Sequence, residues 1–164
     1  MTIDIDKFKK LKALVIGDLM IDEYLWGSVD RISPEAPVPV VCVQKESQTL
    51  GGAGNVINNL VAMGAAVCAI GTAGTGKAGQ MIFEKLEDLG IGTDGIISEP
   101  QRPTTRKTRV IASNQQVLRI DKEDKKNKRQ RSYYFFAHGR APAKLKIPPV
   151  TMSAKPDHKN GTSG

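Results

Sequence analysis

The sequence lacks any long uninterrupted run of apolar residues, and this absence excludes a membrane-spanning helix. Such a helix needs roughly 18 to 20 consecutive, mostly apolar residues, and no stretch of the 164-residue chain approaches that length. The N-terminal segment MTIDIDKFKKLKALVIG alternates charged and apolar residues, so it does not have the apolar centre of a signal peptide. We therefore expect a cytoplasmic protein with no membrane partner.

Cysteine and histidine are also scarce, with two of each in the chain. Cys42 and Cys68 show no CxxC or Cys/His spacing, and His138 and His158 have no partner at the spacing of a metal site or a catalytic triad. Both cysteines lie among apolar residues, so we expect buried thiols in a reducing compartment. We predict neither a disulfide framework nor a metal site.

The positive charge of the chain is confined to its last forty residues. Residues 1–124 hold 14 basic against 16 acidic residues, whereas residues 125–164 hold 10 basic residues and the single acidic residue Asp157. Aromatic residues at 133–136 beside two arginines could stack on bases, but a charged extension outside a folded domain is the commoner case. We predict a domain at 1–124, a basic tail of low order at 125–164 from a shifted frame or an unrelated segment, and no nucleic-acid partner.

Residues 1–124 alternate between strand and helix patterns, which is typical of an α/β domain. An acidic and aromatic segment at 18–27 is expected to form a loop, and prolines before residue 38 place the next strand at a sheet edge. Polar and apolar alternation on both sides of a Ser-Asn turn predicts an exposed hairpin or lid. The expected elements are strands at 11–16, 38–43 and 66–70, helices at 55–63 and 78–89, and a hairpin at 105–112 and 117–120.

Two aspartates, Asp18 and Asp22, follow the first predicted strand and carry the first candidate site. On a helical turn, their spacing of four would direct both carboxylates into one pocket at the strand's C-terminal end. Carboxylates in such a place can accept hydrogen bonds from the hydroxyls of a polyol. Two solvated acids explain the spacing equally well, and a magnesium site formed with Glu23 is a third, weaker interpretation.

A glycine-rich turn at Gly51–Asn55 precedes the first predicted helix. The backbone of Gly51 and Gly52 can approach a ligand without obstruction by side chains, and Asn55 adds a donor and an acceptor. A plain tight turn accounts for the glycines about as well.

The segment Gly71–Gly79 contains GxxxxGK, the beginning of a P-loop, and also GxGxxG with Asp94 about twenty residues later. A P-loop needs Ser or Thr after its lysine to hold Mg²⁺. Here the residue after Lys77 is Ala78. The P-loop and dinucleotide interpretations are therefore weak alternatives.

Four segments together resemble the ribokinase-like carbohydrate kinases of the phosphofructokinase B type, and most closely the bacterial D-glycero-β-D-manno-heptose 7-phosphate kinases. The RISPEAPVPV string at 31–40 is the most specific of them, and the resemblance covers roughly residues 8–124. The family's aspartate in G-x-D-x-x-G is Gly76 here, which removes a side-chain cap of the following helix. The other segments are GDLMID at 17–22, GGAGN at 51–55, and NQQ at 114–116 with Arg119 and Asp121.

The resemblance implies the N-terminal part of a doubly wound α/β domain with a β lid. It implies a sugar phosphate bound by Asp18, Asp22, Gly51, Gly52 and Asn55, with Arg119 as a partner for the phosphate. ATP with Mg²⁺ would phosphorylate the anomeric hydroxyl on the route to ADP-heptose and lipopolysaccharide. No residue of this chain matches the family's catalytic aspartate in a late GAGD motif, so we expect no catalytic residue and no kinase activity from the chain alone.

Three alternatives to a truncated kinase remain open, and each makes a different prediction. A non-catalytic sugar-phosphate-binding module would bind the sugar without turnover. A P-loop nucleotide binder would lose ATP affinity when Lys77 is replaced, and a nucleic-acid binder would depend on the tail and on salt. A half-sheet leaves an unpaired edge, so we also expect marginal stability and association of copies, with a homodimer through the lid as one possibility.

Overall fold

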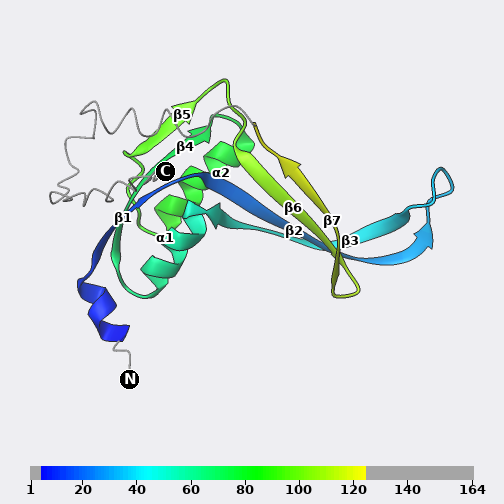
Figure 1. Ribbon diagram of the computed structural model, residues 1–164, viewed down its shortest axis with the longest axis horizontal. Helices are drawn as coiled ribbons and strands as arrows, with labels where there is room; N and C mark the ends of the chain where they lie inside the picture. Colours follow the sequence, from blue (N-terminus) through cyan, green and yellow to red (C-terminus); the bar gives the residue numbers. More distant parts are fainter. Residues whose placement is uncertain (1–4, 125–164) are drawn as a thin grey trace, which may run out of the picture.

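The computed structural model describes residues 5–124, which form two β-sheets that meet at one end (Figure 1). The predicted basic tail at 125–164 lies outside the described residues. A short 3-10 helix, η1 (Ile5–Lys10), leads into the first strand. Neither it nor any other helix in the described part is long and apolar enough to cross a membrane.

The first sheet is parallel and has the order β1-β4-β5. Its strands are β1 (Lys12–Ile16), β4 (Ala66–Gly74) and β5 (Ile96–Glu99). The first two confirm the predicted strands, whereas β5 was not predicted because its four residues are too few to show a period. Within residues 5–124, β1 pairs on one side only, with β4, so one edge of this sheet is left without a described neighbour.

Two helices pack against the parallel sheet and confirm the predicted helical periodicity. They are α1 (Ala53–Ala62) and α2 (Lys77–Asp88). Ile57 of α1 and Ile82 and Leu86 of α2 are fully buried and share one core with alanines of β4. The buried positions are three to four residues apart in each helix, which puts one face of each helix on the sheet; they are Gly54 and Ile57 in α1, and Gly79, Ile82 and Leu86 in α2.

The ends of the helices follow the glycines of the sequence. Gly64 and Gly90 have φ values of 88° and 72° just after the helices, a left-handed conformation that glycine adopts without a steric penalty. At the other end of α2, the N-cap residue Gly76 makes no side-chain hydrogen bond to the helix. The cap that an aspartate would supply is therefore absent, as the sequence predicts.

The second sheet extends away from the helices as a long lid (Figure 1). It has the order β3-β2-β6-β7, with β2 and β6 parallel and the other pairs antiparallel. Ser113 and Asn114 connect β6 to β7 with positive φ values of 51° and 62°, the conformation of a two-residue hairpin turn. The predicted lid hairpin is thus confirmed; the strands are β2 (Leu19–Ile32), β3 (Pro39–Gly52), β6 (Thr105–Ala112) and β7 (Gln115–Lys122).

Two predictions about this sheet are wrong. The segment expected as a loop at 18–27 forms, from Leu19 onward, the first nine of the 14 residues of β2, and Leu19, Ile21 and Glu23 are buried at the two-residue period of a strand. Cys42 is exposed rather than buried, because β3 is the edge strand that the prolines predicted. Cys68 is half-buried, and burial raises the pKa of its thiol.

Candidate functional site

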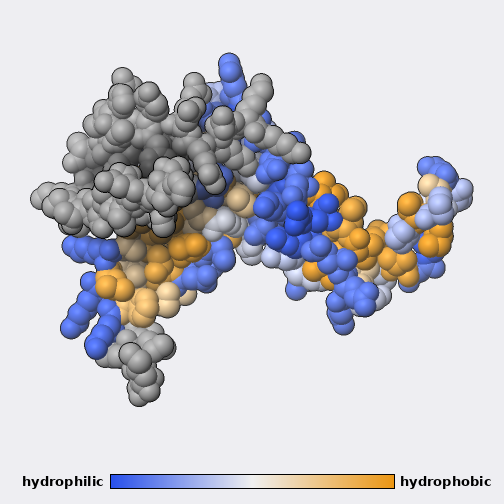
Figure 2. Space-filling view, viewed as in Figure 1, coloured by the Kyte–Doolittle hydropathy of each residue, from blue (hydrophilic) through white to orange (hydrophobic). Residues whose placement is uncertain are grey.

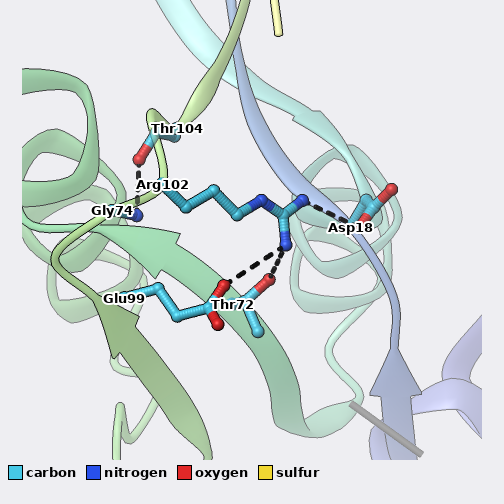
Figure 3. Close-up of polar contacts among 6 residues, drawn as sticks. All are labelled: Asp18, Thr72, Gly74, Glu99, Arg102 and Thr104. Atoms are coloured by element: carbon cyan, nitrogen blue, oxygen red, sulfur yellow. Dashed lines mark hydrogen bonds and ion pairs between the residues drawn. The ribbon is translucent and has the colours of Figure 1, made fainter. Parts of the chain in front are cut away.

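The chain passes twice from the parallel sheet to the lid, and a charged residue lies at each of these two crossings. Asp18 stands between β1 and β2, and Arg102 stands in the loop between β5 and β6. Both crossings lie at the C-terminal ends of the parallel strands, where open α/β sheets bind their ligands. Figure 3 shows the two side chains pointing toward each other across this end of the sheet.

Arg102 connects the crossings to the parallel sheet. Its Nη1 donates a hydrogen bond to Thr72 Oγ1 of β4 at 3.0 Å and lies 3.8 Å from Glu99 Oε2, while Nη2 lies 3.8 Å from Asp18 Oδ1 (Figure 3). Next to it, Thr104 Oγ1 accepts a hydrogen bond of 2.8 Å from the backbone N–H of Gly74. The sequence interpretation missed Arg102, whose only signal was its place between two predicted elements.

Asp22 lies on strand β2, so the expected helical turn from Asp18 to Asp22 is wrong. Its Oδ1 accepts a hydrogen bond of 2.8 Å from Arg109 Nη1 of β6, and both side chains are largely buried. The hydrogen bond to Asp22 raises the pKa of the Arg109 guanidinium, although burial acts in the opposite direction. Asp22 is thus a fixed acceptor with one oxygen engaged by an arginine.

Gly51 and Gly52 bring β3 against both aspartates. A Cβ on Gly51 would lie 2.6 Å from Asp22 Oδ2, and a Cβ on Gly52 would lie 2.6 Å from the carbonyl oxygen of Asp18. Gly52 also has a φ of 59°, which favours glycine. The same carbonyl of Asp18 accepts a hydrogen bond of 2.9 Å from Ala53 N at the start of α1. The predicted site residues Asp18, Asp22, Gly51 and Gly52 are therefore neighbours, with Asp22 contacting β3 through its carboxylate and Asp18 through its backbone.

Asn55 lies in the first turn of α1 and is exposed. An open groove of about 570 Å³ runs between β1 and α1 and has Asp18 and Gly52 in its lining. The groove is mostly apolar, and Val56 and Ile16 contribute to its wall. The glycine turn, the helix start and Asp18 thus border one open depression.

Glu23 does not join the two aspartates, so the magnesium interpretation has no support in the geometry. Successive residues of a strand point to opposite faces, and Glu23 is buried on the face away from Asp22, where it accepts hydrogen bonds of 2.6 Å from Thr108 and Gln48. Burial raises the pKa of Glu23, but these hydrogen bonds and the nearby Arg106 outweigh it, so the pKa lies below its ordinary value. No group of three metal-ligating side chains occurs within residues 5–124.

The P-loop interpretation also loses its structural basis. The first half of the motif, Gly71 to Gly74, belongs to β4 and pairs with β5. The N–H of Gly71 donates a hydrogen bond to the carbonyl of Gly95, and the N–H of Gly74 donates one to Thr104 Oγ1. Neither N–H is therefore free to hold a phosphate. A Cβ on Gly79 would lie 1.7 Å from the carbonyl oxygen of Gly74, so close packing against β4 explains the glycine at position 79.

Arg119 lies apart from the two aspartates. It is on the outer strand β7, its side chain is half exposed, and its Nε lies 3.0 Å from Asp121 Oδ1 of the same strand. The register places it opposite Arg109. Its assignment to a phosphate stays a prediction.

Comparison with protein families gives one match that covers most of the chain. The pfkB family carbohydrate kinase model matches residues 10–137. The chain is 59% identical over 122 residues to the bifunctional protein HldE of Desulfatibacillum aliphaticivorans and 56% identical over 117 residues to that of Helicobacter hepaticus. These alignments cover 74% and 71% of the chain but 25% and 24% of the relatives. The chain thus spans about a quarter of the length of the curated relatives it matches.

Solved structures agree on the fold. The chain is similar to a carbohydrate kinase from Agrobacterium tumefaciens, with a TM-score of 0.55, 23% identity, and coverage of 68% of this chain and 35% of that one. It is also similar to Arabidopsis thaliana ribokinase complexed with ribose and ATP, with a TM-score of 0.55, 20% identity, and the same two coverages. At these identities the likeness shows the ribokinase-like α/β fold.

Proposed function

Since the chain belongs to the pfkB family of carbohydrate kinases, we propose that it binds a phosphorylated heptose, D-glycero-D-manno-heptose 7-phosphate, between the two sheets. The observation that carries this proposal is the meeting of Asp18, Asp22, Gly51 and Gly52 at the crossing from the parallel sheet to the lid. These residues come from two of the four segments that carry the family resemblance, GDLMID at 17–22 and GGAGN at 51–55.

The chemistry of the site suits a polyol. Each carboxylate has lone pairs for several hydroxyl donors, and Arg109 holds one oxygen of Asp22 so that the other, Oδ2, faces Gly51. The absence of a side chain at Gly51 and Gly52 lets β3 lie directly against the carboxylate of Asp22 and the backbone of Asp18. Asn55, whose side chain has no partner within residues 5–124, adds a donor and an acceptor at the start of α1.

For a complete kinase of the kind that the sequence resembles, we infer transfer of the γ-phosphoryl group of ATP to the anomeric hydroxyl, on the route to ADP-heptose and lipopolysaccharide. Such transfer depends on positioning and on a base that accepts the hydroxyl proton. The described residues do not fit a magnesium–nucleotide group, because their carboxylates do not converge and β4 offers no phosphate-holding loop. We therefore assign to this chain binding of the sugar without turnover.

Isothermal titration calorimetry with the heptose 7-phosphate tests binding, and a coupled assay of ADP release tests turnover. We expect one sugar site per chain, affinity reduced at least roughly tenfold by Asp18→Asn or Asp22→Asn because a hydrogen bond to a charged group is lost, and no ADP release. Glu84→Gln, on the surface of α2, is the matched control. Heptose-dependent ADP release by the purified chain would refute the assignment of binding without turnover.

The lid also supports the proposed homodimer. Apolar side chains gather on the outer part of the four-stranded sheet (Figure 2), and Val43, Leu118 and Ile120 are each about half exposed there. Burying such a patch in a second copy would remove it from water. Sedimentation analysis of the wild type and of Leu118→Glu tests this: the dimer should dissociate in the variant, and a wild-type monomer at all concentrations would contradict it.

A further inference from the structure

One face of the lid collects positive charge near Asp22. Because residues alternate between faces and neighbours in register share a face, the register of the lid strands places Asp22, Lys107 and Asp121 side by side across three strands. Two residues further along each strand, the same face carries Tyr24, Arg109 and Arg119. This row of ionisable residues is called the lid charge row below, and it consists of Asp22, Lys107, Arg109, Arg119 and Asp121.

Both carboxylates of the lid charge row are already engaged by arginines. Asp22 is bonded to Arg109 at 2.8 Å, and Asp121 is paired with Arg119 at 3.0 Å. Lys107 lies between the two carboxylates in register, is half-buried, and has no hydrogen-bond or ion-pair partner within residues 5–124. The lid charge row thus holds three basic residues against two carboxylates, and an anionic ligand would balance the additional positive charge.

We propose that Lys107, with Arg109 beside it, forms a subsite for a phosphate monoester group on the sugar-binding face of the lid. The inference rests on the proposed function for the identity of the ligand, because the phosphate would be the one that the sugar carries. Lys107 is the residue that makes the site prefer a phosphorylated sugar over a neutral one. Lys107 is a point charge with three donors, which suits a phosphate without requiring a fixed geometry.

The spacing of the strands fits this ligand. Asp22 and Lys107 are directly opposite on neighbouring strands, which lie about 4.8 Å apart, and Arg109 is two residues further, about 6.6 Å along β6. A sugar hydroxyl held by Asp22 and a phosphate held by Lys107 are thus within the length of one sugar phosphate. Arg119 is less suited, because it is paired with Asp121 and lies on the outermost strand.

Inorganic phosphate is the first probe. Its binding is monitored through amide chemical shifts in nuclear magnetic resonance, at a constant ionic strength maintained with chloride. We expect saturable shifts along β6 and β2 in the wild type, an affinity reduced roughly tenfold to a hundredfold in Lys107→Gln, and retention in Lys107→Arg. Lys85→Gln on α2 removes the same charge away from the lid and should bind as the wild type does. An equal loss in Lys85→Gln and Lys107→Gln would overturn the subsite, as would absence of saturable shifts in the wild type.

Calorimetry with the heptose and its 7-phosphate separates the subsite from the proposed function. We expect the preference of the wild type for the phosphorylated sugar to disappear in Lys107→Gln while the affinity for the neutral heptose is unchanged. If neither sugar binds but inorganic phosphate still depends on Lys107, the subsite stands and the proposed function fails. If both sugars bind with equal affinity in the wild type, the proposed function stands and the subsite is wrong. Arg119→Gln should keep the preference, and loss of the preference there would also contradict the assignment to Lys107.

Discussion

Replacement of Gly51 by alanine offers a sharp test of the site, because the structure specifies what the added methyl group would meet. A Cβ there would lie 2.6 Å from Asp22 Oδ2 and 3.0 Å from Met20 Cγ. The carboxylate would have to move by roughly 0.8 Å to restore an ordinary contact distance. Gly51 is not among the residues with positive φ, so alanine brings no backbone strain and the effect comes from Asp22.

The cost of Gly51→Ala follows from the bond between Asp22 and Arg109. A hydrogen bond between charged groups is worth about 1.5–3 kcal/mol, and partial exposure of both side chains lets part of it re-form. We expect unfolding free energy to fall by about 1–2 kcal/mol, and the melting temperature by about 4–8 °C for a unit of this size. Sugar affinity should fall at least roughly tenfold, since Oδ2 is turned away from the sugar.

Differential scanning calorimetry and sugar titration check both expectations. Gly92→Ala is the control, because a Cβ there meets only Asp94 Oδ2 at 4.0 Å and the residue has no positive φ. It should melt within about 0.5 kcal/mol of the wild type. Unchanged melting and unchanged sugar affinity in Gly51→Ala would refute the close contact between β3 and Asp22 on which the site depends.

Three further substitutions have defined outcomes. Gly76→Asp should raise the unfolding free energy by roughly 0.3–1 kcal/mol in a thermal melt, because an aspartate caps α2 and favours its dipole; a lower melting temperature would contradict it. Glu23→Gln should lower the free energy of unfolding by about 1 kcal/mol at neutral pH. The fold lowers the pKa of Glu23, so the stabilisation by its carboxylate is fully present above the ordinary carboxyl pKa. This stabilisation is lost as the pH falls through the pKa of Glu23 in the folded protein. Wild type and variant should therefore converge in acid, and a constant difference across the titration would count against this cause. Arg102→Met should weaken sugar binding less than twofold further in an Asp18→Asn background, because both act through one carboxylate; additive losses would show that Arg102 does not act through Asp18.

Much of the parallel sheet could be predicted from the sequence because its elements are locally specified. The helices at α1 and α2 carry apolar residues at helical spacing, and Gly64 and Gly90 end them with positive φ values. The hairpin turn at Ser113 and Asn114 was predicted from this residue pair and from the alternation of polar and apolar residues on both sides of it. Each of these features depends on residues close together in the chain.

The lid strand β2 could not be predicted in the same way, because its partners β3 and β6 come from distant parts of the sequence. Aspartates and aromatic residues in 18–27 suggested a loop, although cross-strand contacts such as Asp22 with Arg109 determine the strand. Arg102 and Lys107 were missed for a similar reason, because their significance depends on residues that are distant in the sequence. Arg102 contacts Asp18 and Thr72. Lys107 lies in register between Asp22 and Asp121, which are each paired with an arginine. The predicted site residues that meet in the structure were first singled out by the spacing of the two aspartates and by the glycine-rich turn, and the family resemblance then associated them with a sugar.

The most direct test of the sugar site is a map of amide chemical shifts on adding the heptose 7-phosphate to the isotopically labelled chain. We predict saturable shifts at residues 17–22, 51–55 and 105–109, which lie on separate segments and meet at the crossing between the sheets. We predict no comparable shifts at Lys77 or along the exposed surface of α2. Shifts confined to Gly71–Gly79, or no saturable shifts in residues 17–22 and 51–55, would contradict the assignment of this end of the parallel sheet to a sugar phosphate.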